Sequence, residues 1–197
     1  MLERVEETYR ALREKPAAAP PPRSEPEVRA EPAPAPKRVN WELRSQGEIV
    51  DHILEHYHAG LRRDLPALIA ASRSVVRENA AHPDVPAGLT DLLETLSNEL
   101  EGHMQKEERV LFPALRTNER GGSISMPIRM MERDHEAHDA MLDELRTLTR
   151  NFSAPADAPA AWSTLYADLA ALETALHEHI YLENNVLFAR AVGGSDY

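Results

Sequence analysis

The 197-residue sequence contains no cysteine, and this absence removes several kinds of chemistry at once. Disulfide bonds, thiolate metal ligands and cysteine redox reactions are all excluded. Any metal ion must therefore be held by nitrogen and oxygen ligands. Basic residues are also in the minority, with 22 lysines and arginines against 33 aspartates and glutamates and a formal net charge of −11. This balance argues against a nucleic-acid partner, because nucleic-acid-binding proteins usually carry a basic surface.

Long hydrophobic runs are missing as well, and none approaches the length of a membrane span. The first residues, Met-Leu-Glu-Arg-Val-Glu-Glu, are too charged for a signal peptide. We therefore expect a cytoplasmic protein with no membrane partner. The length suits one well-cored domain with an appendage, or two small domains. The oligomeric state stays open at this point.

Two segments precede the predicted main domain. Residues 1–15 carry apolar side chains at roughly helical spacing and are predicted to form a short amphipathic helix or a tail. Residues 16–40 are rich in proline and alanine, a composition that cannot bury a core and favours extended, polyproline-like conformations. We interpret them as a semi-rigid linker to a domain at 41–197.

From Trp41 onward the hydrophobic pattern is helical. Apolar residues recur three and four positions apart in long segments, and glycine and proline gather between these segments. The pattern predicts helices at about 46–79, 88–117, 126–151 and 160–191. Four long helices joined by short loops predict an all-α, up-down-up-down four-helix bundle.

The predicted second and fourth helices contain similar segments. His103 and Glu107 are four residues apart and are followed by Val-Leu-Phe, and His179 and Glu183 repeat this arrangement. A histidine and a glutamate at this spacing lie on one face of a helix. A lone histidine on the preceding helix completes each hairpin. These are His58, 45 residues before His103, and His135, 44 residues before His179.

Six polar residues occupy inward positions that the spacing would otherwise give to leucine or isoleucine. Burying polar groups is unfavourable unless they are paired or bind something. Counting along the helices at about 1.5 Å per residue places all six in one layer. We expect two first-row transition metal ions there, with each hairpin supplying one half-site. If each glutamate bridges, each ion receives two histidine nitrogens and two carboxylate oxygens. The candidate ligands are His58, His103, Glu107, His135, His179 and Glu183.

These residues resemble the hemerythrin-like domain of the iron–sulfur cluster repair di-iron proteins, over about residues 41–192. The resemblance implies two iron ions per chain in an oxo- or hydroxo-bridged, non-haem di-iron centre. The ligand set by itself leaves zinc and manganese open. It implies bridging by Glu107 and Glu183 and terminal ligation by the four histidines. Local matches include Ile49–His58, Leu65-Pro-Ala-Leu68, Val110-Leu-Phe-Pro113 and Leu182-Glu-Asn-Asn-Val-Leu-Phe188.

The resemblance further implies a role in nitrosative and oxidative stress: binding nitric oxide or oxygen and assisting the repair of damaged iron–sulfur clusters, with iron–sulfur proteins as clients. Many members carry an N-terminal domain with adjacent cysteines, whereas this sequence has the proline-rich segment and no cysteine. Two other uses stay open, a protein that only binds or senses the gas and an enzyme that reduces nitric oxide or peroxide.

Two further residues are left with alternatives. His138 is either a fifth histidine ligand or a residue that packs beside the site. Glu99 lies one turn before His103 and either orients a ligand imidazole or is an exposed helix charge.

Overall fold

The computed structural model of the chain describes residues 39–117 and 122–193. The predicted N-terminal helix or tail (1–15), and the predicted linker (16–40) apart from Val39 and Asn40, lie outside the described residues. The described residues divide into two units, with the boundary between Leu43 and Arg44. The described part of the first unit contains one 3₁₀ turn, η1 (Trp41–Leu43).

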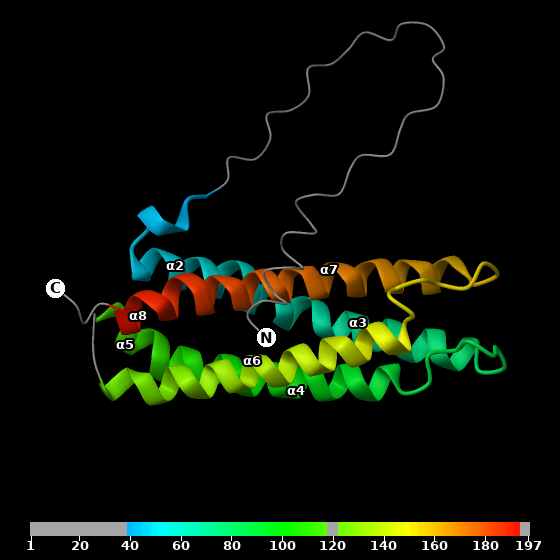
Figure 1. The fold of residues 1–197 in the computed structure, drawn as a ribbon. Helices are drawn as coiled ribbons and strands as arrows, with labels where there is room; N and C mark the ends of the chain where they lie inside the picture. Colours follow the sequence, from blue (N-terminus) through cyan, green and yellow to red (C-terminus); the bar gives the residue numbers. More distant parts are fainter. Residues whose placement is uncertain (1–38, 118–121, 194–197) are drawn as a thin grey trace, which may run out of the picture. The chain divides into compact units, whose positions relative to one another are not determined.

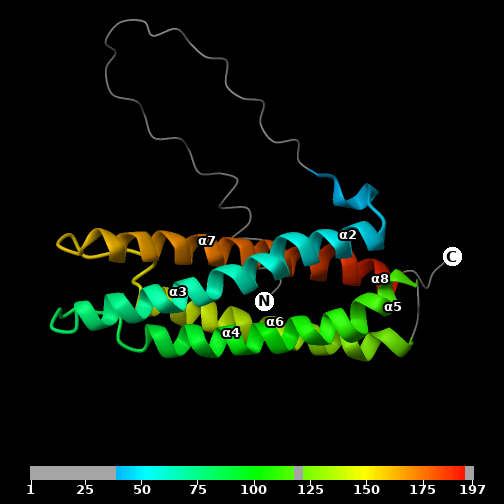
Figure 2. The ribbon, with the colours of Figure 1, turned by 180° about the vertical axis from the view of Figure 1, so that it is seen from behind.

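The second unit is a bundle of four long antiparallel helices, three of them interrupted by a π-helical turn (Figures 1 and 2). The described residues contain no strand, so the all-α four-helix prediction is confirmed. Within the described ranges, no helix has both the length and the apolar composition needed to cross a membrane. In chain order the elements are α2 (Gln46–His52), η2 (Ile53–His58) and α3 (Ala59–Glu78); α4 (Leu89–Lys106), η3 (Glu107–Leu111) and α5 (Phe112–Arg116); α6 (Gly122–Leu148); and α7 (Ala160–Leu182), η4 (Glu183–Phe188) and α8 (Ala189–Gly193).

Local chemistry explains where several helices begin and end. A capping box starts α2, because the Ser45 hydroxyl accepts a hydrogen bond from the Glu48 N–H at 3.2 Å and Glu48 accepts one from the Ser45 N–H at 2.9 Å. Gly88, with φ of +88°, allows the left-handed turn before α4. The third helix ends at Leu148, three residues before its predicted end, because the backbone is left-handed from Arg150 to Phe152.

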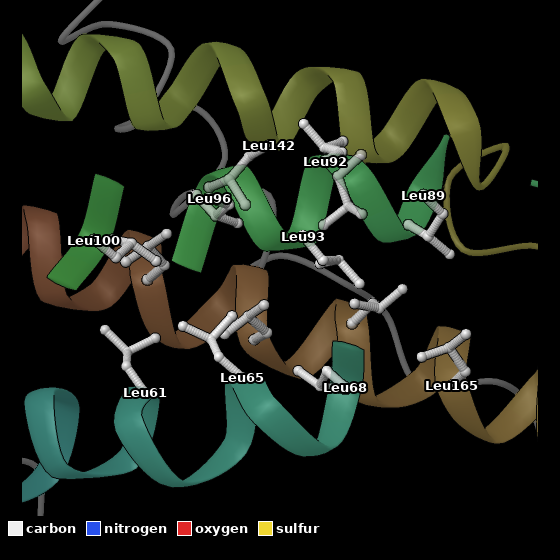
Figure 3. Packing of buried hydrophobic residues seen from close by; sticks show 14 of the residues in the cluster. Leu61, Leu65, Leu68, Leu89, Leu92, Leu93, Leu96, Leu100, Leu142 and Leu165 are labelled. Carbon is white, nitrogen blue, oxygen red and sulfur yellow. The ribbon is translucent and has the colours of Figure 1, made fainter. Parts of the chain in front are cut away.

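A leucine-rich core fixes the rotation of the helices about their axes. Leu65 of α3, Leu96 of α4 and Leu142 of α6 lie in one buried cluster with leucines of α7 (Figure 3). Burying each such side chain contributes about 1.5–3 kcal/mol. The inward faces are therefore defined by many apolar contacts, and the same faces carry the polar residues further along each helix.

Candidate metal centre

The six candidate ligands come together in the interior of the bundle. Each is at most 2% exposed, and both glutamates are completely buried. The first long helix contributes His58, the second His103 and Glu107, the third His135, and the fourth His179 and Glu183. All four helices therefore meet at this layer, as the helical rise predicts.

The ligands form two groups that share both carboxylates. The first group contains His58 and His179, the second contains His103 and His135, and Glu107 and Glu183 belong to both. In each group, one ligand atom per residue lies within 4.8 Å of the others. Sharing of this kind is what two neighbouring ions bridged by carboxylates require.

The histidines pair across the two hairpins and not within them. Each hairpin was expected to form one half-site, and this expectation is wrong, because His58 groups with His179 and His103 with His135. The reason lies in the packing of the bundle. Helix α3 packs against α4 as well as α7, but the turn that ends at His58, η2, packs against α7, which carries His179. Helix α4, which carries His103, packs against α6, which carries His135, so each group forms between helices of different hairpins.

Three π-helical turns coincide with ligands. His58 is the last residue of η2, while Glu107 and Glu183 are the first residues of η3 and η4. A π turn inserts an extra residue into a helix and rotates the residues that follow, and such turns are frequent at functional sites. The sequence did not indicate them, because one extra residue barely disturbs a hydrophobic period of 3.6.

Distances between ligand atoms match a bridging arrangement. The Nε2 atoms of His58 and His103 lie 3.3 and 3.4 Å from the same oxygen of Glu107, Oε2. Glu183 presents one oxygen to each group, with Oε1 2.9 Å from Nε2 of His179 and Oε2 3.1 Å from Nε2 of His135. The carboxylates therefore lie between the two groups.

Several of these buried atoms have no hydrogen-bond partner among the described residues. They are both carboxylate oxygens of Glu107, Oε2 of Glu183 and Nε2 of His58, whose neighbours are close but lack hydrogen-bond geometry. Leaving charged atoms buried and unpaired is strongly unfavourable. Bound cations would satisfy all of them, and imidazole and carboxylate donors suit iron, manganese or zinc. The residues present thus fit a pair of metal ions.

The second ring nitrogen of three candidate ligands is held by a partner outside the groups. Nδ1 of His58 lies 2.8 Å from Glu108, Nδ1 of His103 lies 3.3 Å from Asp134, and Nδ1 of His135 lies 3.0 Å from Oδ1 of Asn184. An Nδ1–H donated to these oxygens leaves the Nε2 lone pair facing the centre. Arg62 and Lys106 in turn hold Glu108 and Asp134.

The sequence did not lead us to predict the hydrogen-bonding partners Glu108, Asp134 and Asn184. Glu108 and Asn184 each follow a candidate glutamate ligand, and Asp134 precedes a candidate histidine ligand, so adjacency was an available signal. Glu99, expected to orient an imidazole or to be exposed, is exposed. His138 is buried, lies outside both groups and packs its ring 5.1 Å from that of His103.

In the metal-free protein, electrostatic interactions within the centre favour a protonated His103 and an ionised Glu183. Burial opposes protonation of His103, but Glu107, Glu183 and Asp134 together outweigh it and raise the pKa of His103 to about 9. Burial likewise opposes ionisation of Glu183, and His179 and His135 outweigh it and hold its pKa well below the usual range. Burial, together with the positive His103, lowers the pKa of His138 to about 3, so this residue is neutral at physiological pH.

Comparisons with known proteins agree with this geometry. The family model of the hemerythrin HHE cation-binding domain matches residues 50–191, a range that contains all six candidate ligands. The iron–sulfur cluster repair protein YtfE of Escherichia coli O157:H7 is 40% identical over 162 residues, which cover 82% of this chain and 73% of that protein. The YtfE proteins of Escherichia coli SMS-3-5 and Escherichia fergusonii give the same values.

Proposed function

The chain belongs to the hemerythrin HHE cation-binding family, and we propose that it holds two iron ions, binds nitric oxide or oxygen there, and assists the repair of damaged iron–sulfur clusters. In this proposal His58, His103, His135 and His179 are terminal ligands. Glu107 and Glu183 bridge the two ions. Iron–sulfur proteins are the clients.

One observation carries the metal part of the proposal: two groups of four buried donors share the same two carboxylates. A single ion would need only one group. Two unconnected ions would not need common ligands. Shared carboxylates, with orphaned oxygens between the groups, favour two ions held side by side.

The protein's own residues would hold and enclose the ions. Glu108, Asp134 and Asn184 fix three imidazole rings through Nδ1. The two Val-Leu-Phe segments supply apolar walls, because Phe112 stacks on His58 with ring centroids 5.7 Å apart and Phe188 stacks on His135 at 6.2 Å. Both phenylalanines are at most 2% exposed, so they keep bulk water from these faces.

Bound iron would supply a redox-active Lewis acid with affinity for small diatomic gases. With four imidazoles and only two carboxylates, the protein offers few anionic donors for highly oxidised iron, which favours gas binding or iron release over hydroxylation. The similarity to proteins named for iron–sulfur cluster repair supports repair over a purely gas-binding role.

Metal content is the first test. The 197-residue protein should contain about two irons per chain and absorb in the near ultraviolet, and Glu107→Ala or Glu183→Ala should remove much of the iron. Retention of both irons in these variants would refute the ligand assignment. The control is Glu99→Ala, which removes an exposed carboxylate of α4.

Function is tested on a client. The iron-loaded protein should restore activity to an iron–sulfur enzyme damaged by nitric oxide and lose iron as it does so, whereas the metal-free protein should not. Unchanged iron content with reversible gas binding would favour the sensing alternative. Steady-state consumption of nitric oxide or peroxide with an electron donor would favour the reductase.

A further inference from the structure

One candidate ligand is fixed differently from the other three. Nδ1 of His58, His103 and His135 each has a hydrogen-bond partner. Nδ1 of His179 is buried and has none among the described residues, although the side chain is only 1% exposed. Metal-binding histidines nearly always use the second nitrogen to fix the ring. The imidazole of His179 therefore needs another means of orientation.

An aromatic ring packs against the face of this imidazole. The ring of Tyr57 stacks on that of His179 with centroids 5.1 Å apart and an interplanar angle of 9°. The ring of His58 approaches the same imidazole edge-on, at 5.1 Å and 71°. Offset stacked and edge-to-face contacts at such distances are the favoured aromatic geometries. Two consecutive residues of η2 thus hold His179 from two directions.

The duplicated sequence gives Tyr57 a counterpart. Tyr57 immediately precedes His58, as Asp134 immediately precedes His135. Asp134 contacts His103, which groups with His135, and Tyr57 contacts His179, which groups with His58. The two residues occupy equivalent positions: one hairpin provides a carboxylate that accepts a hydrogen bond, and the other provides a ring that stacks.

Tyr57 also borders a groove on the outer side of the bundle. The groove has a volume of about 530 Å³, lies between α3 and α7, and is kept open by small residues such as Gly60, Ala67 and Ala171. A water molecule in liquid occupies roughly 30 Å³, so the groove has room for a cation with a full hydration shell. Tyr57 is half-buried and is in contact with both the groove and His179.

We propose that Tyr57 is a positioning residue that orients His179 by stacking, and that the ion of the first group enters and leaves through this groove when the Tyr57 ring swings aside. The second group has hydrogen-bond anchors on both histidines, so its ion is the more firmly held. The inference rests on the proposed metal centre and adds an order to it: the ion between His58 and His179 exchanges first.

The test uses the full chain loaded with Co²⁺, and follows removal of the metal by excess EDTA through the cobalt absorption bands. The wild type should lose its two ions in two phases. Tyr57→Leu should accelerate the first phase by about 10- to 100-fold, if the loss of affinity seen when a partner of a ligating histidine is removed is expressed in the dissociation rate. Tyr57→Phe keeps the ring and should match the wild type. Tyr181→Leu is the matched control, because Tyr181 is a half-buried tyrosine of α7 that does not line the groove.

Blocking the groove tests the route. Ala171→Leu fills the groove from α7 and should slow the first phase without changing the equilibrium affinity. Equal rates in the wild type, Tyr57→Leu and Ala171→Leu would overturn the inference while leaving the metal centre intact. Failure of the wild type to bind two ions would instead overturn the proposed function.

A metal-free readout keeps the role of Tyr57 testable in either case. Deuterium exchange at the imidazole carbon of His179, measured by mass spectrometry on the apoprotein, should be faster in Tyr57→Leu than in the wild type and unchanged in Tyr57→Phe. Identical exchange in all three proteins would show that the Tyr57 ring does not cover His179.

Discussion

Replacing Glu183 with glutamine should remove most of the metal binding while leaving the fold intact. The side chain is completely buried, and its oxygens face different histidines, His179 at 2.9 Å and His135 at 3.1 Å. The amide has the same shape, but it lacks the negative charge and turns one acceptor into an N–H donor. This one substitution therefore weakens metal binding by both groups.

The size of the effect can be expressed as metal-dependent stability. A ligand at 100 times its Kd stabilises the folded state by about 2.7 kcal/mol, so two occupied groups contribute about 5 kcal/mol. Removing an outer partner of a ligand already costs about 10- to 100-fold in affinity, so we take about 100-fold per group for a ligand itself. At the same metal concentration, each group of the variant then contributes only about 0.4 kcal/mol of metal-dependent stability. At about 2–4 °C per kcal/mol, the metal-induced rise in Tm should fall from about 10–20 °C to about 2–3 °C.

Thermal unfolding with and without Co²⁺, followed by circular dichroism, measures the metal-induced rise in Tm of the wild type and of the Glu183→Gln variant. The apoprotein melts show whether the Glu183→Gln variant is folded. Glu99→Gln is the matched control, because it removes an exposed carboxylate from α4 and should keep the full metal-induced rise. A Glu183→Gln protein with two bound ions and the wild-type rise in Tm would refute the bridging role.

The remaining predictions concern groups around the ligands. Metal affinity of the apoprotein should increase as the pH rises from about 7 to 9, because His103 has its pKa raised to about 9 and must lose its proton to bind; binding at pH 7 should release protons, which a pH indicator detects. By the same shift, the charged His103 stabilises the apoprotein fully below pH 6.5, and this contribution is lost as the pH rises through about 9. Asp134→Asn and Glu108→Gln should each weaken metal binding by about 10- to 100-fold in calorimetric titrations. His138→Leu should keep both ions and raise the free energy of unfolding by about 1–3 kcal/mol, because the buried Nδ1 of His138 has no partner among the described residues; loss of an ion would show that His138 is a ligand.

The fold was predictable because its signal is distributed over long segments. Each helix carries several apolar residues at helical spacing, and residues such as Leu65, Leu96 and Leu142 are buried as that spacing predicts. The end of α6 was less predictable. Residues 149–151 continue the helical pattern in the sequence, but the left-handed backbone at Arg150 to Phe152 ends the helix earlier, and a choice of backbone conformation of this kind leaves little trace in hydrophobicity.

The positions of the six candidate ligands were predictable for a related reason. A histidine or glutamate is easily recognised at a helical position where the hydrophobic period predicts leucine, and the sequence contains two copies of the same spacing. How the histidines pair was not predictable in this way. The repeat associates His58 with His103, whereas the packing of η2 against α7 groups His58 with His179. Helix spacing along the chain contains no information about which helices become neighbours across the bundle.

The two hairpins are more alike in their candidate ligands than in the residues that anchor those ligands. Glu107 and Glu183 begin equivalent π turns, and the residue after each anchors a histidine, Glu108 in one hairpin and Asn184 in the other. An ionised carboxylate makes its imidazole partner a stronger donor to a metal than a neutral amide does. The residue before each lone histidine differs further, since Asp134 accepts a hydrogen bond and Tyr57 stacks. Equal ligands with unequal supports are expected to produce two metal positions of different affinity, so a symmetrical ligand set need not give two equivalent ions.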